Sequence, residues 1–162
     1  MTTSTISRAD LRTPTWRDRL AATGVTIFRV VIGGMFLTHG TANLFGWPAG
    51  GMSPEVGAWP GWYASVIEIV VGALVVLGLF TRPAALLGSG AMAYAYLSVH
   101  LADGFWPVTS GAQDAALFAW GFLLLAFTGP GALSLGRALR SRRTDADTPA
   151  PTPVEVREHA LV

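Results

Sequence analysis

Four long apolar stretches, separated by short polar or turn-forming segments, dominate the middle of the chain. They cover residues 24–45, 62–80, 83–102 and 112–128. Each is close to the length that a helix needs to cross the hydrocarbon core of a bilayer. A soluble helical bundle would need a polar face on every helix, and these stretches have none. The pattern therefore predicts an all-α protein, a bundle of four transmembrane helices that run up, down, up and down.

The second and third stretches differ in how readily they would insert. Residues 62–80 hold eleven Leu, Ile, Val and Phe residues against one charge, Glu68, so this helix can insert by itself. Residues 83–102 are rich in Ala, Gly and Ser instead. Small residues let helix backbones approach closely, so we expect the third helix to pack among its neighbours.

The two ends of the chain have a different composition. Residues 1–15 and 141–162 are rich in Thr, Pro, Ala and charge, which predicts disordered tails. Residues 16–140 then form the membrane domain. The first apolar stretch lacks an A-x-A cleavage site, so we expect it to remain as an anchor.

Overall composition agrees with a membrane protein. Of the 162 residues, 51% are hydrophobic and 13% charged, and the mean hydropathy is positive. The formal net charge of +1 gives no basic field for nucleic acid, so no nucleic-acid partner is expected. The chain has no cysteine, which excludes disulfides and thiolate nucleophiles, and no motif predicts a metal site.

The arginines predict the orientation of the bundle. They cluster before the first stretch, at Arg82 between the second and third, and after the fourth, whereas residues 47–61 and 103–111 contain none. The positive-inside rule then puts both termini and the Arg82 turn in the cytoplasm of a multi-pass cytoplasmic-membrane protein. In the first outer loop, Ser53-Pro54-Glu55 predicts a short interfacial helix, because these residues suit a cap and a first turn.

Polar side chains of three helices fall at one depth. With about 1.5 Å of rise per residue, His39 lies about 21 Å above the cytoplasmic boundary, Glu68 about 18 Å and Tyr96 about 20 Å. His100 follows Tyr96 by one turn, and Asn43 shares a face with His39. An unpaired carboxylate at this depth costs several kcal/mol, so we expect Glu68 to pair with His39 or with the third helix. The predicted outer-leaflet pocket comprises His39, Asn43, Glu68, Tyr96 and His100.

Other roles remain open for these residues. Glu68 and His39 could form a polar pair that only joins two helices, and two histidines on different helices could ligate a haem, although no further signal supports this. Arg29 lies about 6 Å above the inner interface, too low to pair with Glu68, and we expect it to reach lipid headgroups or act as a structural charge. Arg82, in the tight turn, has the same two interpretations.

Three segments occur in an order that resembles the DoxX-like family of small four-helix membrane proteins. They are GGMFLTHGTANLFG (33–46), EIVVGALVVLGLFTRPAAL (68–86) and GPGALSLG (129–136), within a resemblance that spans residues 24–136. It points to His39, Gly40, Glu68, Gly72, Thr81, Arg82, Ser134 and Leu135. Two positions depart from the family pattern, because Asn43 stands where many relatives have Lys, and Gly136 where they usually have Asp.

The resemblance also implies a function. Relatives are associated with quinone-linked or thiol-linked membrane redox systems, commonly as small subunits beside a larger catalytic partner. We therefore expect a non-catalytic subunit of an oxidoreductase complex rather than an enzyme by itself, with a quinone as the candidate ligand and a larger redox subunit as the partner. The alternatives are a proton-coupled small-molecule transporter that uses Glu68, and a membrane scaffold whose arginines dock a soluble cytoplasmic protein.

Overall fold

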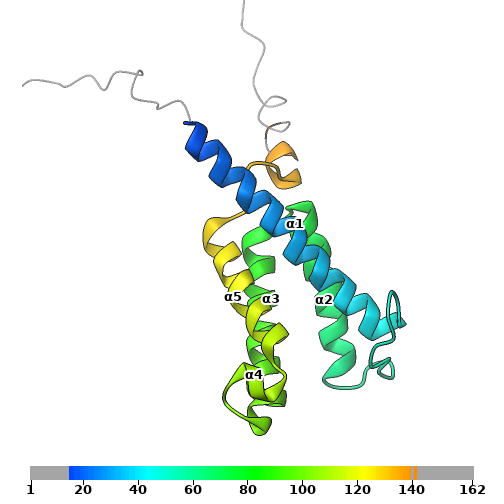
Figure 1. The fold of residues 1–162 in the computed structure, drawn as a ribbon. Coiled ribbons are helices and arrows are strands. Elements are labelled where there is room, and N and C mark those ends of the chain that lie inside the picture. Colours follow the sequence, from blue (N-terminus) through cyan, green and yellow to red (C-terminus); the bar gives the residue numbers. More distant parts are fainter. Residues whose placement is uncertain (1–14, 140, 142–162) are drawn as a thin grey trace, which may run out of the picture.

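The computed structural model describes residues 15–139 and residue 141, and this part of the chain forms helices and loops without any strand. Four long helical segments run alternately up and down (Figure 1). They are α1 (Trp16–Phe45), α2 (Gly61–Leu77), α3 (Thr81–Ala95) with its π-helical and 3₁₀ extensions, and α5 (Gln113–Thr128). A four-residue helix, α4 (Pro107–Ser110), lies between the last two. The all-α prediction is confirmed.

The helices coincide with the predicted apolar stretches, with shifts at the ends. α1 begins eight residues before Gly24, because Thr15 caps it in a reciprocal capping box with Asp18. α2 stops at Leu77, where Gly78 adopts a left-handed conformation with φ 71°. Apart from Thr15 and Ser141, the predicted disordered tails lie outside the described residues.

Two of these segments satisfy the length and hydropathy expected of a membrane span. They are α1 and the helical segment Thr81–Asp103. α2 and α5 are also apolar but shorter, at 17 and 16 residues.

The helices pack as two pairs. α1 lies mainly against α2, and α3 against α5, whereas α2 and α3 touch less and α1 and α5 least. Glycines bring α1 and α2 close together: a Cβ on Gly40 would lie 2.8 Å from the Glu68 Cβ, and one on Gly72 would lie 2.7 Å from the Leu37 nitrogen. No larger residue fits at either position without moving a helix.

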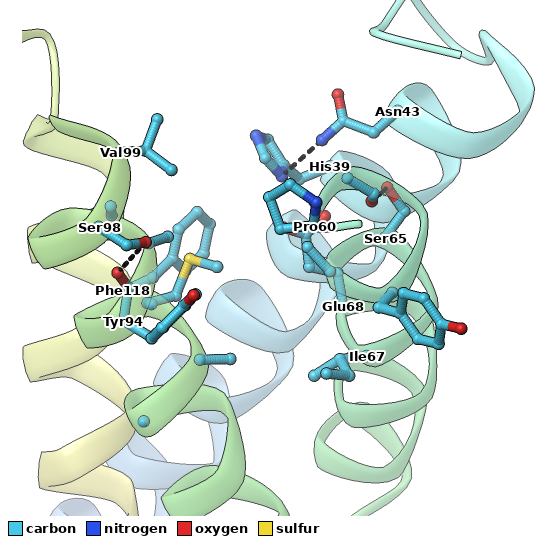
Figure 2. Close-up of a pocket in the computed structure, with 18 of the residues that line it drawn as sticks. His39, Asn43, Pro60, Ser65, Ile67, Glu68, Tyr94, Ser98, Val99 and Phe118 are labelled. Atoms are coloured by element: carbon cyan, nitrogen blue, oxygen red, sulfur yellow. Dashed lines mark hydrogen bonds and ion pairs between the residues drawn. The ribbon is translucent and has the colours of Figure 1, made fainter. Parts of the chain in front are cut away.

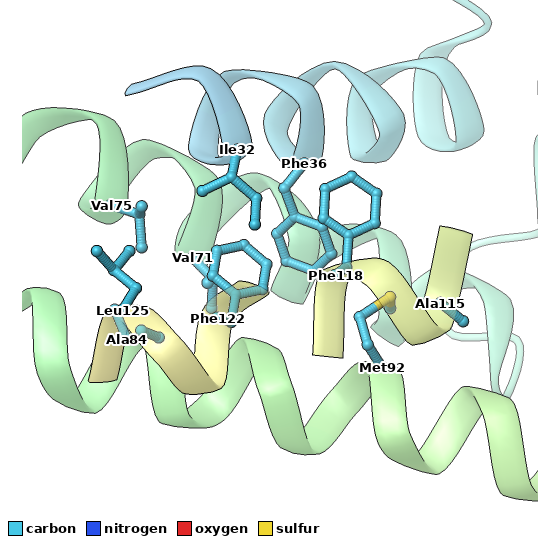
Figure 3. Close-up of a cluster of buried hydrophobic side chains, with 11 residues drawn as sticks. Ile32, Phe36, Val71, Val75, Ala84, Met92, Ala115, Phe118, Phe122 and Leu125 are labelled. Carbon is cyan, nitrogen blue, oxygen red and sulfur yellow. The ribbon is translucent and has the colours of Figure 1, made fainter. Parts of the chain in front are cut away.

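A hydrophobic core joins the two pairs (Figure 3). Phe36 of α1 is fully buried, with its ring centroid 5.1 Å from that of Phe118 and 4.7 Å from that of Phe122, both on α5. Val71 and Val75 of α2 are fully buried in the same cluster. The core therefore holds the pairs together along the middle of the bundle.

One end of the bundle, here called the closed end, comprises Arg29, residues 78–82 and residues 129–134. Arg29 is only 3% exposed, and its guanidinium donates hydrogen bonds to the carbonyls of Val75, Val76 and Leu133 at 2.5, 2.7 and 2.7 Å. It therefore caps the last turn of α2 and holds the segment after α5. These contacts fit the structural charge of its two predicted roles.

Arg82 lies at the same end. Its side chain is exposed, and its Nε is 3.3 Å from where a Cβ of Gly129 would stand. Arg82 therefore covers the end of α5. Gly129, with φ 80°, leaves room for the guanidinium.

The predicted helix at Ser53-Pro54-Glu55 is wrong. These residues form an irregular loop in which Ser53 has φ 41°, and the Ser53 N–H donates to the Asn43 carbonyl at 2.9 Å. This bond folds the loop back onto the end of α1, and the positive φ of Ser53 departs from the extended conformation of a helix N-cap. A short helix occurs instead at α4, between α3 and α5, with Pro107 in its first turn.

Candidate functional site

A cleft of about 860 Å³ lies between α2 and α3, with its polar residues at the end of the bundle away from Arg29 and its apolar lining running along α3 to Pro83, next to the closed end. Phe118 and Ala115 of α5 form part of its lining and also belong to the core. Met52, Trp59 and Pro60 contribute from the loop before α2. Figure 2 shows His39, Asn43 and Glu68 on one side of the cleft, with Tyr94, Ser98 and Val99 on the other. We call this region, with its polar residues His39, Asn43, Glu68, His100 and Asp114, the open end.

His39 and Glu68 are in direct contact in the cleft. The Nδ1 atom of His39 lies 3.0 Å from Oε2 of Glu68, and both residues line the cavity. The Glu68 side chain is 4% exposed, whereas that of His39 is 47% exposed. The predicted pairing of these two groups is therefore confirmed, and His39 connects a buried carboxyl to the open space of the cleft.

The close approach of α1 and α2 produces this contact. Gly40 follows His39, and its missing side chain lets the backbone of α1 lie against Glu68 and Ile69. A side chain at position 40 would separate the two helices at this level. Gly40, which the family resemblance had indicated, is thus a positioning residue for the His39–Glu68 pair.

A single proton can occupy either member of the pair. If Nδ1 of His39 carries it, the imidazole donates to the Glu68 carboxylate; if Glu68 carries it, the carboxylic acid donates to Nδ1. Asn43 Nδ2 lies 3.3 Å from the same nitrogen and can donate to it only when that nitrogen is unprotonated. The arrangement can deliver a proton to, or accept one from, a ligand in the cleft.

The opposite wall contributes His100 and Asp114. The cleft lining includes His100, as predicted, and also Asp114 in the first turn of α5, which the sequence reasoning did not single out. A signal was present, because Asp114 is a carboxylate just inside the fourth apolar stretch. Among the described residues, no group of three or more histidines or carboxylates could hold a metal ion.

Tyr96 does not belong to the cleft lining, so this prediction is wrong. The Tyr96 side chain packs against the core, and its hydroxyl donates to the Phe105 carbonyl. Tyr94 lines the cleft instead. It continues the face of α3 that carries Leu87 and Gly90, whereas Tyr96, two residues further on, lies on the other side of the helix. A π-helical turn at Tyr96–His100, closed by a bond from the Leu101 N–H to the Tyr96 carbonyl, follows.

Comparisons with known proteins identify a family and several relatives of this chain. The DoxX family model matches residues 24–101, which include His39, Glu68 and His100 but not the segment 129–136. A protein of Haemophilus influenzae, described only as uncharacterized, is 40% identical over 116 residues, which cover 68% of this chain and 87% of that protein. No solved structure matches the chain.

Two further relatives are named as membrane proteins. An uncharacterized membrane protein of Mycobacterium tuberculosis is 31% identical over 151 residues, covering 81% of this chain and 92% of that protein. The inner membrane protein YphA of Escherichia coli is 38% identical over 82 residues, covering 46% of this chain and 56% of that protein. The residues that the family model matches include both His39 and Glu68. From this match and these relatives, the chain belongs to the DoxX family of integral membrane proteins.

Proposed function

We propose that this protein is an accessory subunit of a membrane redox system and binds a quinone-like ligand at the His39–Glu68 pair. The observation that carries the proposal is a buried carboxyl, bonded to a half-exposed imidazole, in a mostly apolar cleft. A quinone needs apolar walls around its ring and a proton-exchanging group at a carbonyl oxygen. The cleft supplies both.

The redox centre would come from a partner. The chain has no cysteine, so it offers no thiolate for electron transfer or cluster ligation. Its own residues would bind and orient the ligand and hold the proton at His39 Nδ1 or at the Glu68 carboxyl. A larger catalytic subunit would then supply the electrons.

The bundle would cross the cytoplasmic membrane four times, with the closed end toward the cytoplasm. The exposed arginines at positions 17, 19, 82 and 137 lie in segments that form or adjoin the closed end. The loops at the opposite end, residues 46–61 and 103–112, contain neither Lys nor Arg. Because the chain has no cysteine, single-cysteine variants can test this orientation cleanly. In whole cells, an impermeant maleimide should label Glu55→Cys but not Ala138→Cys; the reverse would invert the bundle.

Ligand binding can be tested directly on the full chain in lipid nanodiscs. A benzoquinone with a ten-carbon alkyl chain should quench tryptophan fluorescence saturably, since Trp59 lines the cleft. Glu68→Gln should weaken binding at least about tenfold, which corresponds to 1.4 kcal/mol. Glu55→Gln is the matched control, because it removes a carboxylate from the exposed loop, outside the cleft lining. Equal binding by the wild type and Glu68→Gln would refute the proposed site.

Proton-coupled transport is a second candidate. The observation in its favour is that the two helix pairs enclose a cleft at the open end, with Glu68 buried at its side. A carboxyl in such a position could couple a substrate to a proton. Proteoliposomes with a pH gradient would then show substrate flux that Glu68→Gln abolishes, whereas a quinone-binding subunit would show none.

A further inference from the structure

One face of α3 lines the cleft instead of packing along its whole length against another helix. The residues of α3 and its extension on this face are Pro83, Leu86, Leu87, Gly90, Ala91, Tyr94, Ala95 and Ser98. Their spacings alternate between three and one, which makes a single stripe along one side of a helix. At about 1.5 Å per residue, the stripe is about 22 Å long. It follows the helix from its first turn nearest the closed end up to the polar residues of the open end.

The opposite wall covers only part of this stripe. α2 contributes residues of its first half, between Gly61 and Glu68, because Val71 and Val75 below them are buried in the core. Leu86 and Leu87 of α3 remain 59% and 54% exposed. The cleft is therefore open sideways, toward lipid, along its apolar part.

Beside the middle of the stripe the cleft is open, and aromatic side chains lie nearer the open end. A Cβ on Gly90 would meet no atom within 4 Å, so the cleft is open at this level. Above it, the Trp59 ring lies 6.1 Å from the Tyr94 ring and 5.8 Å from the Tyr63 ring. These rings connect the α2 side of the cleft to the α3 side. The part of the cleft between these rings and the closed end is apolar and uncovered, so it is the open route to lipid.

Polarity changes from one end of this cleft to the other. His39, Glu68 and His100 lie at one end, and Pro83, Leu86 and Leu87 at the other. We propose that the stripe holds the single hydrocarbon chain of a membrane amphiphile whose head reaches His39 and Glu68, so the ligand enters sideways from the bilayer between α2 and α3. This inference rests on the proposed function and specifies its ligand as a molecule with a long chain.

The size and polarity of the cleft fit a small amphiphile. Its volume of about 860 Å³ lies in the range of small-molecule sites. Its polar residues gather at one end of an apolar stripe, which matches a head group with one chain.

Lipid chains are as apolar as the leucines of the stripe, so the chain gains little affinity by leaving the lipid. The position of the chain is therefore a better test than its affinity. The probe is a benzoquinone whose ten-carbon chain ends in a photoreactive diazirine, bound to the full-length protein in nanodiscs. After illumination, peptide mapping by mass spectrometry locates the adducts, and tryptophan quenching measures binding separately.

Adducts on residues 83–91 would support the proposal, provided that Gly90→Phe lowers them at least about fivefold. Gly34→Phe is the matched control, because position 34 of α1 also has open space around it but lies outside the cleft lining. It should leave the adducts unchanged. At both positions an added Cβ meets no atom within 4 Å.

The other outcomes separate the two hypotheses. Binding that depends on Glu68, with adducts on residues 47–59 or spread evenly over Leu117 and Leu124 of α5, would overturn the sideways route and leave the proposed function intact. Absence of saturable binding would overturn both. A disulfide between two copies of Leu87→Cys that excludes the probe would assign the stripe to a second copy of the chain and overturn the inference.

Discussion

The two ends of the bundle each bury an ionisable side chain, and they satisfy it in opposite ways. At the closed end, Arg29 donates three hydrogen bonds to main-chain carbonyls from two distant segments. At the open end, Glu68 contacts the side chain of His39, which itself is 47% exposed in a cleft. Arg29 is held by main-chain carbonyls, whereas Glu68 is bonded to a side chain that is exposed in the cleft.

This difference separates a structural charge from a candidate site. Carbonyls cannot change their protonation, so the Arg29 contacts can only stabilise one arrangement of α1, α2 and the segment after α5. The His39–Glu68 pair can hold its proton on either partner and has room for a ligand beside it. Burial of a charge within the membrane is therefore informative only together with the identity and exposure of its partners.

Replacement of Arg29 should have the largest effect on stability. Arg29→Met removes the side-chain donor from the carbonyls of Val75, Val76 and Leu133, of which Val75 keeps the Gly78 N–H, and hydrogen bonds to charged groups contribute about 1.5–3 kcal/mol each. We expect a loss of at least about 3 kcal/mol in the free energy of unfolding, measured by denaturant titration in detergent. Arg19→Met, at an exposed site on the same helix, should change it by less than about 0.5 kcal/mol. Similar stabilities for the two variants would contradict the structural role.

A side chain at position 40 should disturb both stability and the site. Gly40→Ala puts a methyl group 2.8 Å from the Glu68 Cβ and 2.9 Å from the Ile69 nitrogen, so α1 must move away from α2. We expect a loss of about 1–3 kcal/mol, as for other overpacked sites, together with weaker quinone binding. Gly34→Ala, in open space on the same helix, is the control. Normal binding in Gly40→Ala would show that the helix spacing does not position the pair.

Two neighbouring tyrosines should respond in opposite ways. Tyr96→Phe loses the hydrogen bond to the Phe105 carbonyl, so we expect about 1 kcal/mol less stability and unchanged quinone binding. Tyr94→Phe alters a hydroxyl of the cleft lining instead, so binding should weaken while stability changes by less than about 0.5 kcal/mol. Thermal unfolding and tryptophan quenching measure the two quantities. The reversed pattern would contradict the positions of Tyr94 in the cleft and of Tyr96 outside it.

Glu68→Gln should change stability far less than Arg29→Met. The substitution keeps a hydrogen-bonding group beside His39 and removes a charge that is costly to bury, so the free energy of unfolding should stay within about 1 kcal/mol of the wild type, or rise. Residues kept for function are often unfavourable for stability. The same denaturant titration as for Arg29→Met applies. A loss of stability as large as that of Arg29→Met would show that the His39–Glu68 pair serves to hold α1 and α2 together.

The sequence alone determined the features that depend on local chemistry. Hydropathy located the four helices, since an apolar stretch of sufficient length forms a helix in lipid whatever its neighbours. The constant rise of a helix put His39 and Glu68 at one depth, and the cost of an unpaired carboxylate required a partner for Glu68. Both inferences hold in the structure.

The tertiary structure decided the features that depend on how distant segments meet. It gave Arg29 its carbonyl partners, about 46 and 104 residues away, brought Asp114 to the cleft, and turned Tyr94 rather than Tyr96 toward the cleft. Hydropathy fixes how deep a residue lies but says little about the direction in which it points around its helix axis. That direction follows from side-chain packing and from close contacts such as Gly40 against Glu68, which exist only once the helices have assembled.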